Sequence, residues 1–221
     1  MRANSPPVVS NQHGPHPDLA EVVARHLEHP WRAPLHQPSA RVFAAWVAAV
    51  AAPGRELILD SGCGTGDSTR LLALQNPEAL VLGIDQSEVR LQAEDSDLQQ
   101  IGAHAWLLRA RAETIWRCLL AASFRVSRHC LWYPNPWPKS AHLQRRWHGH
   151  PAWPDLLQLS ATIELRSNWA TYVDEFALAL AQSGWQAERD VVAGSEAPVS
   201  PFEKKYRESG HALHRLRAQP R

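Results

Sequence analysis

The stretch Glu56-Leu57-Ile58-Leu59-Asp60-Ser61-Gly62-Cys63-Gly64-Thr65-Gly66-Asp67 decides the fold of this chain. Its first five residues predict a short apolar strand that ends in an acid. Three glycines at alternate positions follow, and they let the turn approach a ligand closely because glycine has no Cβ. A helix is expected from Asp67, and its first backbone N–H groups would point toward the same ligand.

A second apolar strand is expected at residues 79–85, and it also ends in an acid, Asp85. Asp85 comes 19 residues after Gly66, where a carboxylate is placed to accept both hydroxyls of a ribose. The glycine spacing is G-x-G-x-G and not the G-x-G-x-x-G of dinucleotide sites. The turn and the two acids together predict a nucleoside cofactor. The alternative is a glycine-rich turn used only for tight strand–helix packing.

Strands and helices alternate along the chain beyond this stretch. We expect further strands at residues 103–109, 126–133, 161–166 and 185–192, with a weaker one at 211–217. Helices are expected at residues 18–29, 39–51, 67–74, 87–95, 112–121 and 169–182, with Pro53-Gly54 ending the second. This order predicts an α/β fold with a mostly parallel, doubly wound sheet and an antiparallel last strand. We expect a disordered leader at 1–17 and a single domain at 18–221, with ligands at the carboxyl ends of the strands.

Composition limits the class of protein. The chain has 221 residues, enough for one sizeable core, and contains no apolar run long enough to cross a membrane. The polar N-terminus has no signal-peptide pattern, so we expect no membrane association. The three cysteines, Cys63, Cys118 and Cys130, show no CxxC spacing, which favours reduced core thiols and a cytoplasmic location.

Residues 134–139, Pro-Asn-Pro-Trp-Pro-Lys, follow the fourth expected strand. Three prolines restrict the backbone, so Asn135 can contact a base edge with little loss of entropy. Trp137 either stacks on a base or packs beneath the loop. Lys139, Arg145 and Arg146 have no evident acid partner nearby and are expected to contact phosphates.

Positive charge is concentrated in this segment and at the C-terminal end. Residues 139–150 contain three cations and no acid, and residues 203–221 carry six cations against two acids. The alternative to phosphate binding is two solvated basic faces. His142 either joins the cations or is solvated. We expect no metal site at His142, His148 and His150, because no cysteine lies nearby.

Three stretches resemble one known family, the tRNA (guanine-N7)-methyltransferases of TrmB type. Residues 134–146 are similar to its PDPW-x-K-x-x-H-x-x-RR motif, and residues 167–172 are similar to its TD strand end followed by W-x-x-Y. Residues 200–203, Ser-Pro-Phe-Glu, are similar to its late (T/S)-x-F-E segment. The resemblance covers roughly residues 56–217. It implies a Rossmann-like class I methyltransferase that uses S-adenosyl-L-methionine and modifies the variable-loop guanosine of tRNA, position 46, as a monomer or homodimer.

The resemblance also implies roles for individual residues. The residues that would bind the cofactor are Asp60, Gly62, Gly64, Gly66, Asp85, Arg111, Ala112 and Asn135. The catalytic positions are Asn135 and Asn168, and the substrate would contact Lys139, Asn168, Ser200, Phe202 and Glu203. The RNA backbone would contact Lys139, His142, Arg145 and Arg146.

The chain departs from the family at three of these positions. Asn135 and Asn168 stand where the family has aspartates, and Arg111 replaces an acid beside the adenine. Guanine N7 carries a lone pair and no proton, so methyl transfer needs no general base and depends on positioning and electrostatics. Loss of two carboxylates removes stabilisation of the positive product, which lowers the rate or shifts the substrate.

Two other functions are left open at this stage. The first is methylation of an exocyclic amine, although Asn135-Pro136-Trp137-Pro138 carries its aromatic residue one place too early for the NPP-aromatic loop of such enzymes. The second is a non-catalytic RNA-binding relative that keeps the basic surface. Cofactor binding separates this second function from the two enzymes.

Overall fold

The computed structural model describes residues 5–50 and 56–221. The chain divides into two compact units, which are treated one at a time. Unit 1 contains the described residues up to 32 together with 132–154 and 162–221, and unit 2 contains the described residues of 33–131 together with 155–161. The expected helix break at Pro53-Gly54 lies outside the described residues.

Unit 2 is built on the strand order β3-β4-β2-β1-β5. Strand β1 pairs with β2 and β5 in parallel, and β2 pairs with β4 in parallel, whereas β3 runs antiparallel to β4. Every residue of β1 and β2 is buried, as expected for central parallel strands covered on both faces. The strands are β1 (Leu57–Ser61), β2 (Leu80–Asp85), β3 (Leu98–Gly102), β4 (Ala105–Arg109) and β5 (Val126–Trp132).

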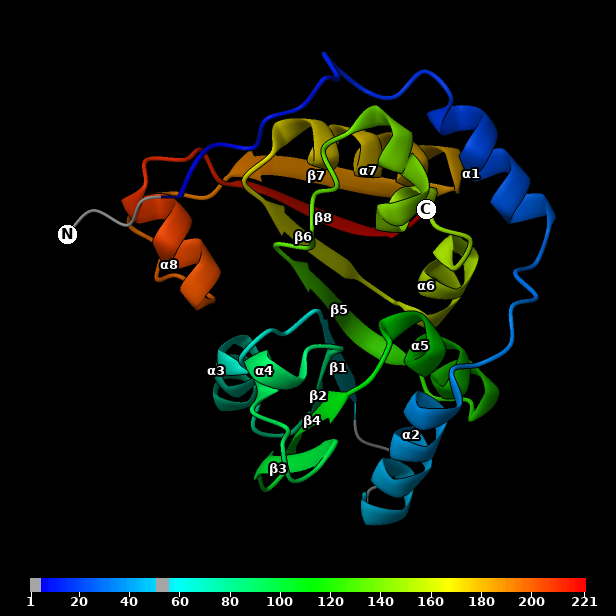
Figure 1. Cartoon of the computed structure of the whole chain (residues 1–221), viewed down its shortest axis with the longest axis vertical. Helices are drawn as coiled ribbons and strands as arrows, with labels where there is room; N and C mark the ends of the chain where they lie inside the picture. The colour runs from blue at the N-terminus through cyan, green and yellow to red at the C-terminus, as the bar shows by residue number, and fades with distance from the viewer. Residues whose placement is uncertain (1–4, 51–55) are drawn as a thin grey trace. The chain divides into compact units, whose positions relative to one another are not determined.

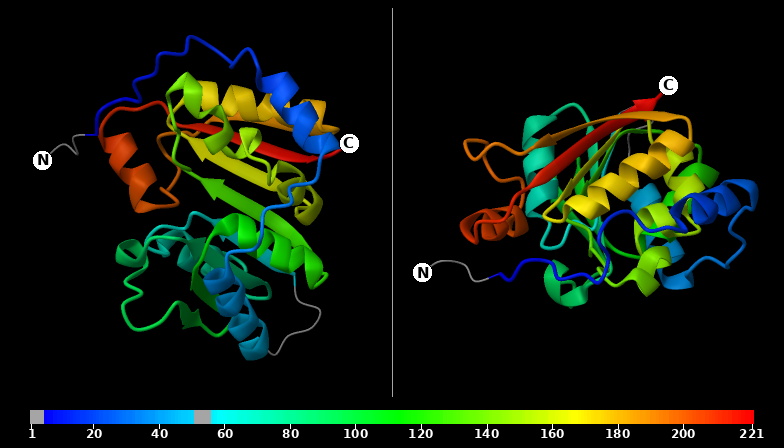
Figure 2. Two further views of the ribbon diagram at one scale, coloured as in Figure 1. Left: turned by 45° about the vertical axis from the view of Figure 1, so that its right-hand side comes forward. Right: turned by 90° about the horizontal axis from the view of Figure 1, so that it is seen from above.

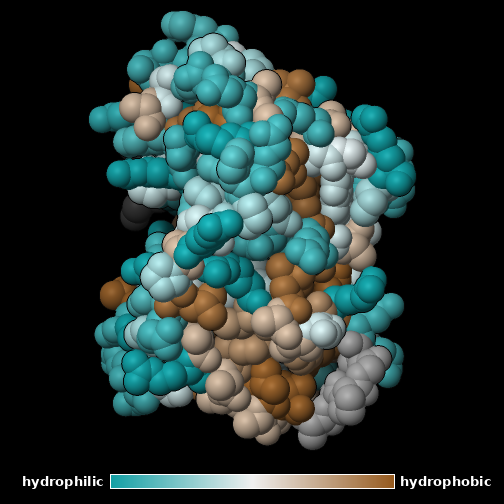
Figure 3. Space-filling view, turned by 90° about the vertical axis from the view of Figure 1, so that its right-hand side faces the viewer, coloured by the Kyte–Doolittle hydropathy of each residue, from teal (hydrophilic) through white to brown (hydrophobic). Residues whose placement is uncertain are grey.

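The helices of this unit are α2 (Gln37–Ala49), α3 (Asp67–Gln75), α4 (Glu88–Leu91), α5 (Ala112–Ala121) and, from Asp155 on, α6 (Trp153–Leu159). Helix α2 buries Val42, Phe43 and Trp46 on one face, and α2 and α5 are neighbours in Figure 1. Apolar residues reach the surface at the height of α2 and α5 in Figure 3, and Val47 of α2 is 38% exposed.

Unit 1 contains the strand order β6-β8-β7, with β8 antiparallel to both neighbours. The strands are β6 (Ile163–Ser167), β7 (Trp185–Val191) and β8 (His214–Pro220). The helices are α1 (Leu19–Glu28), α7 (Ala170–Gln182) and α8 (Pro201–Glu208), with short 3-10 turns η1 (Ser140–Arg145) and η2 (Trp147–Gly149). Helix α7 lies along this sheet and packs against α1 (Figure 2).

The α/β class and the antiparallel last strand are confirmed. The helix expected at 87–95 begins after its N-cap Ser87 but is shorter than expected, because Gln92 adopts a left-handed conformation with φ 51° and α4 ends at Leu91. The polar strand β3 then pairs with β4, a tertiary pairing that local sequence does not reveal. Helices α6 and α8 were not expected; α8 begins where the Ser200 side chain accepts a hydrogen bond from the N–H of Glu203.

The leader has no helix or strand from Ser5 to Pro17, yet it is not free of the rest of unit 1. The Ser10 hydroxyl donates to the carbonyl of Pro138, and the Gln12 amide donates to the carboxylate of Glu175. These bonds place the described part of the leader against other residues of unit 1, and the disorder expected for this segment stays a prediction. No helix among the described residues is long and apolar enough to span a bilayer.

A neutral histidine joins three elements in the core of unit 2. The Ser160 hydroxyl donates to Leu156 O, so it accepts from Nδ1–H of His129, 2.8 Å away. Nε2 of His129 then accepts from the Ser61 hydroxyl, 2.8 Å away, and that hydroxyl accepts from the Trp116 indole. Each polar hydrogen in this series of hydrogen bonds has an acceptor. Burial lowers the pKa of His129 to about 3.

This pKa predicts an acid-sensitive fold. The unfolded chain gains a proton on His129 below its ordinary pKa of about 6.5, but the native protein does not gain it until about pH 3. His129 therefore contributes stability above pH 6.5 that is lost as pH falls toward 3. We expect the free energy of unfolding to drop by about 2 kcal/mol from this group alone between pH 7 and 5.

Urea unfolding at several pH values, compared between the wild type and His129→Gln, measures this contribution. Subtracting the free energies of unfolding of the two proteins at each pH removes the contributions of other titrating groups, including His148 and His150. Equal pH slopes in the two proteins would contradict the assignment.

Candidate functional site

The glycine-rich turn of unit 2 follows β1. Gly62, Gly64 and Gly66 all have positive φ, at 86°, 59° and 79°. The N–H of Gly62 donates to Ile84 O of the neighbouring strand, 2.7 Å away. A Cβ on Gly66 would lie 2.6 Å from Cδ1 of Leu107, so only glycine fits where α3 begins. Gly62 is exposed and faces open space, which leaves room for a ligand beside the turn.

Asp85 ends β2 next to this turn, and its carboxylate is held by the backbone. Oδ2 accepts from the N–H of Gly64 at 3.0 Å, and Oδ1 accepts from the N–H of Ser87 at 2.8 Å. Two fixed donors orient a carboxylate whose remaining lone pairs are suited to the two hydroxyls of a ribose. Asp85 and the glycines of the turn are thus suited to a nucleoside, and their contacts with the cofactor stay predictions.

Asp60, the acid before the glycines, is buried and anchors α3. Its Oδ2 accepts from the hydroxyls of Ser68 at 2.6 Å and Thr69 at 2.8 Å. Burial raises the pKa of Asp60 to about 6, although the two hydroxyls oppose the shift. The structure therefore gives Asp60 a role in holding the turn against α3, and its contact with the cofactor stays a prediction.

Arg111 and Ala112 lie where β4 gives way to α5. Arg111 is the N-cap residue of that helix, with an exposed side chain, and its N–H donates to the Ser39 hydroxyl, 2.9 Å away. Ala112 is the first helical residue. Their predicted contacts with the cofactor are not tested by these observations.

The proline-rich loop of unit 1 presents Asn135 to solvent. Its Oδ1 accepts from the N–H of Trp137 at 3.3 Å, which is a local turn that leaves the NH₂ group pointing outward. Tyr133 and Trp137 on either side have positive φ, 56° and 45°. The loop thus exposes a hydrogen-bond donor at Asn135 on a constrained backbone.

Asn168 follows β6 and is half-buried. Its Nδ2 lies 3.0 Å from Nδ1 of His211, and Nε2 of His211 lies 2.8 Å from the carbonyl of Ser5. Because the Ser5 carbonyl only accepts, Nε2 carries the proton and Nδ1 accepts from Asn168. The Oδ1 atom of Asn168 is then free of His211 and available as an acceptor. His211 had no signal in the sequence, since its neighbours lie far apart along the chain.

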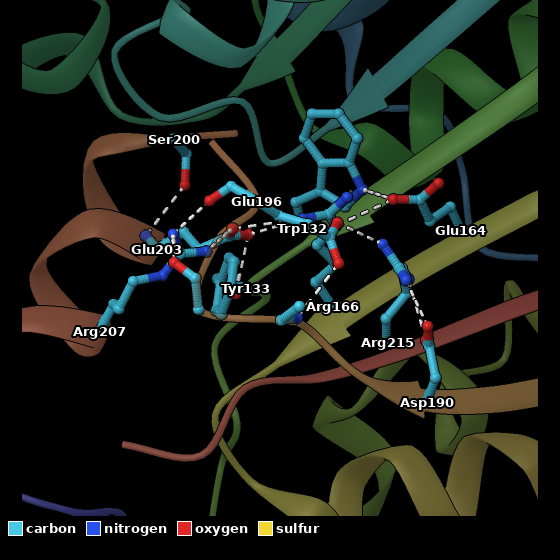
Figure 4. Close-up of polar contacts among 12 residues, drawn as sticks. Trp132, Tyr133, Glu164, Arg166, Asp190, Glu196, Ser200, Glu203, Arg207 and Arg215 are labelled. Atoms are coloured by element: carbon cyan, nitrogen blue, oxygen red, sulfur yellow. Dashed lines mark hydrogen bonds and ion pairs between the residues drawn. The ribbon is translucent and has the colours of Figure 1, made fainter. Parts of the chain in front are cut away.

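Glu203 is fully buried and surrounded by donors (Figure 4). Its carboxylate accepts from Tyr133 Oη at 2.9 Å, from Arg166 Nη1 at 3.0 Å and from Arg207 Nη2 at 3.2 Å. Burial, followed by the charge of Glu203, raises the pKa of Tyr133. The carboxylate thus anchors α8 to Tyr133 and to Arg166 of β6, and the contact of Glu203 with guanine stays a prediction.

The same network extends across the sheet of unit 1. Arg166 donates to Glu164 at 2.9 Å and lies over the Trp132 ring, while Arg215 pairs with Asp190 and Glu196 (Figure 4). Of the remaining predicted substrate contacts, Ser200 uses its hydroxyl to cap α8. Phe202 is half-buried on that helix, and its contact with substrate stays a prediction.

Two of the predicted RNA-binding cations are exposed beside Asn135. Lys139 is exposed, and the exposed Arg145 lies with its guanidinium 4.7 Å from the centre of the Trp137 ring. His142 makes an edge contact with the same ring. Desolvation, followed by the charges of Arg145 and Lys139, lowers the pKa of His142. A neutral His142 among cations indicates a positive local potential.

Arg146 does not belong to this exposed group. It is fully buried, and its Nη1 donates to Glu175 at 2.5 Å. Nε2 of His148 donates to the same Glu175 oxygen at 2.9 Å. Burial opposes ionisation of Glu175, but these donors outweigh it and lower its pKa. Arg146 is thus engaged within unit 1, and its contact with phosphate stays a prediction. No group of three side chains suited to a metal ion occurs in the described part of the chain.

A mostly parallel sheet with a glycine turn after its first strand and a held acid after its second defines the class I methyltransferases that depend on S-adenosyl-L-methionine. Two solved structures share the fold. A 16S rRNA methyltransferase, KamB, has a TM-score of 0.55 at 17% identity, covering 75% of this chain and 87% of its own. A 16S rRNA (adenine(1408)-N(1))-methyltransferase from Catenulisporales acidiphilia has a TM-score of 0.54 at 17% identity, covering 80% and 91%.

The family whose model matches residues 54–216 is described as "Putative methyltransferase", and this chain belongs to it. Relatives named tRNA (guanine-N(7)-)-methyltransferase include one from Nitrosococcus oceani, 28% identical over 73% of this chain and 70% of its own length. Another, from Leifsonia xyli subsp. xyli, is 26% identical over 73% of this chain and 75% of its own length.

Asp85→Asn provides a test of the cofactor site. Removing the charge weakens both hydrogen bonds to a ribose, so we expect the cofactor dissociation constant to rise about 10- to 100-fold. Titration calorimetry with S-adenosyl-L-homocysteine measures this change. Glu94→Gln, an exposed acid of the same unit, should bind as the wild type does. Equal affinity of Asp85→Asn and wild type would remove Asp85 from the site.

Proposed function

We propose that this protein methylates N7 of guanosine in tRNA, at variable-loop position 46, with S-adenosyl-L-methionine as the methyl donor. The observation that carries the proposal is the exposed Asn135 on a constrained loop, flanked by the exposed cations Lys139 and Arg145. The relatives named for this activity support it. Reduced cytoplasmic surroundings suit the three buried free thiols.

The reaction depends on the positioning of the base more than on proton transfer. The cofactor supplies an electrophilic methyl group on its sulfonium centre. Guanine N7 offers a lone pair, so no residue of this chain has to remove a proton. The side chains therefore have to orient the base and tolerate the positive charge that it gains.

Asn135 and Asn168 are suited to orienting guanine. Asn135 directs its NH₂ group outward, and Asn168 keeps Oδ1 available because His211 uses its NH₂ group. Guanine presents O6, an acceptor, next to N1–H, a donor. One outward donor and one available acceptor complement that edge, whereas carboxylates at both positions would only accept.

The same asparagines limit the rate. A carboxylate near the methylated base would stabilise its positive charge, and a neutral amide stabilises it less. With Glu203 neutralised by Arg166 and Arg207, we expect turnover up to about 100-fold below that of a site with two aspartates.

The decisive experiment incubates the protein with labelled S-adenosyl-L-methionine and total tRNA, digests the RNA to nucleosides and separates them. We expect label in 7-methylguanosine and less label with Asp85→Asn at the same cofactor concentration. Label in an N²- or N⁶-methylated nucleoside would assign the enzyme to exocyclic amines instead. Tight cofactor binding without label in RNA would identify a non-catalytic relative.

A separate prediction concerns the RNA contacts of Lys139 and Arg145. Each phosphate contact that is lost should reduce the slope of log affinity against log salt by about 0.7 to 0.9. Filter binding of tRNA at several salt concentrations, with Lys139→Ala and Arg145→Ala, measures the slope. Arg25→Ala, an exposed cation on α1, is the control. An unaltered slope in both variants would place the phosphates elsewhere.

A further inference from the structure

The leader contacts the proline-rich loop and the residue that follows it through residues 10–12. The Ser10 hydroxyl donates to Pro138 O at 2.5 Å, and the N–H of Ser140 donates to Oδ1 of Asn11 at 3.0 Å. Three consecutive leader residues, Ser10, Asn11 and Gln12, therefore bond to the loop or to the side chain that holds it. Figure 2 shows the leader as the dark blue trace leading to α1.

Arg146 is the side chain that holds the loop. Its Nε donates to Trp137 O at 3.2 Å, and Nη2 donates to Trp137 O at 3.1 Å and to Lys139 O at 3.3 Å. The guanidinium also lies 4.9 Å from the centre of the Trp169 ring. A buried cation is stable only when its donors have acceptors. Displacing these carbonyls would leave donors of the buried Arg146 unsatisfied, so the guanidinium holds the loop in place.

The loop needs such support because its backbone is strained. Trp137 has φ 45°, a left-handed conformation that costs a non-glycine residue of order 1 kcal/mol or more. Strain of this kind persists only where surrounding contacts outweigh it. Two hydrogen bonds from one guanidinium to Trp137 O provide that contact, two residues beyond Asn135.

Gln12 completes the set of bonds around Arg146. Its Oε1 accepts from Arg146 Nη2 at 3.1 Å, and its Nε2 donates to Oε1 of Glu175 at 2.5 Å. The N–H of His16 donates to the same oxygen at 2.8 Å. One leader amide thus bridges both members of a buried ion pair, and removing it takes one hydrogen bond from Arg146 Nη2 and one from Glu175 Oε1.

We propose that Gln12 and Arg146 are positioning residues for the loop 134–139, and that the leader sets the orientation of Asn135 and Lys139 toward substrate. The assignment of Asn135 and Lys139 as substrate contacts rests on the proposed function. Gln12 acts through Arg146 and touches no reacting atom. Its contribution is to keep the guanidinium where it binds the carbonyls of the loop.

The test uses full-length protein labelled with 5-fluorotryptophan and observed by ¹⁹F NMR. Trp137→Phe identifies the Trp137 resonance by its disappearance. Gln12→Ala and Gln12→Met should shift or broaden this resonance; Met keeps the size of the side chain and removes only its hydrogen bonds. Val9→Ala is the control, because Val9 is 80% exposed. A Trp137 resonance unchanged in Gln12→Met would overturn the proposal.

Kinetics supply a second readout. We expect kcat for tRNA methylation to fall about tenfold in both Gln12 variants, because a small displacement of the loop misaligns the base. The dissociation constant for S-adenosyl-L-homocysteine should stay at the wild-type value. Equal loss of cofactor binding would show general destabilisation and overturn the positioning role.

The two readouts separate the two proposals. If wild-type protein transfers no methyl group to tRNA, the proposed function fails, while the ¹⁹F comparison still decides whether Gln12 positions the loop. If the wild type is active and both Gln12 variants match it in kcat, the positioning role fails alone.

Discussion

The buried ion pair of Arg146 and Glu175 is the interaction on which the arrangement of unit 1 depends. Taking two charges out of water costs several kcal/mol per ion, and the pair is stable only because other groups satisfy both ends. Glu175 receives donors from His148, Gln12 and His16, and Arg146 donates to two loop carbonyls. These bonds connect α7, the turn η2, the leader and the proline-rich loop. Movement of any one of them would remove hydrogen bonds from a buried charge.

The two units are built by different means. In unit 2 the turn after β1 is shaped by glycines and backbone N–H groups, and the strands around it are apolar. In unit 1 the equivalent shaping comes from buried charged side chains, Arg146 with Glu175 and Arg166 with Glu203. A turn held by backbone hydrogen bonds tolerates substitution of the side chains around it. A loop held by buried charged side chains depends on every one of those side chains. Substitutions in unit 1 are therefore expected to act together rather than additively.

This difference explains how much of the molecule could be predicted from sequence. Strands β1 and β2 are continuous apolar runs with acids at their ends, so the sheet and the position of Asp85 follow from local pattern. Strand β3 has no such pattern, because its form comes from pairing with β4. The burial of Arg146 could not be predicted from the sequence either, because its partner Glu175 is 29 residues away and no spacing rule connects them. Helix α8 had a usable signal in Ser-Pro-Phe-Glu, which fits a capping residue followed by proline, but the stretch was interpreted only as a family motif.

The three cysteines have a practical consequence. Cys63, Cys118 and Cys130 are buried, and burial raises the pKa of the thiols of Cys63 and Cys118, so thiolate, the reactive form, is scarce. A new cysteine on an exposed position would then react with maleimide dyes far faster than the native thiols. The chain is thus suited to site-specific labelling without removal of its own cysteines, and a dye pair on the two units would measure the distance between them as cofactor and RNA are added.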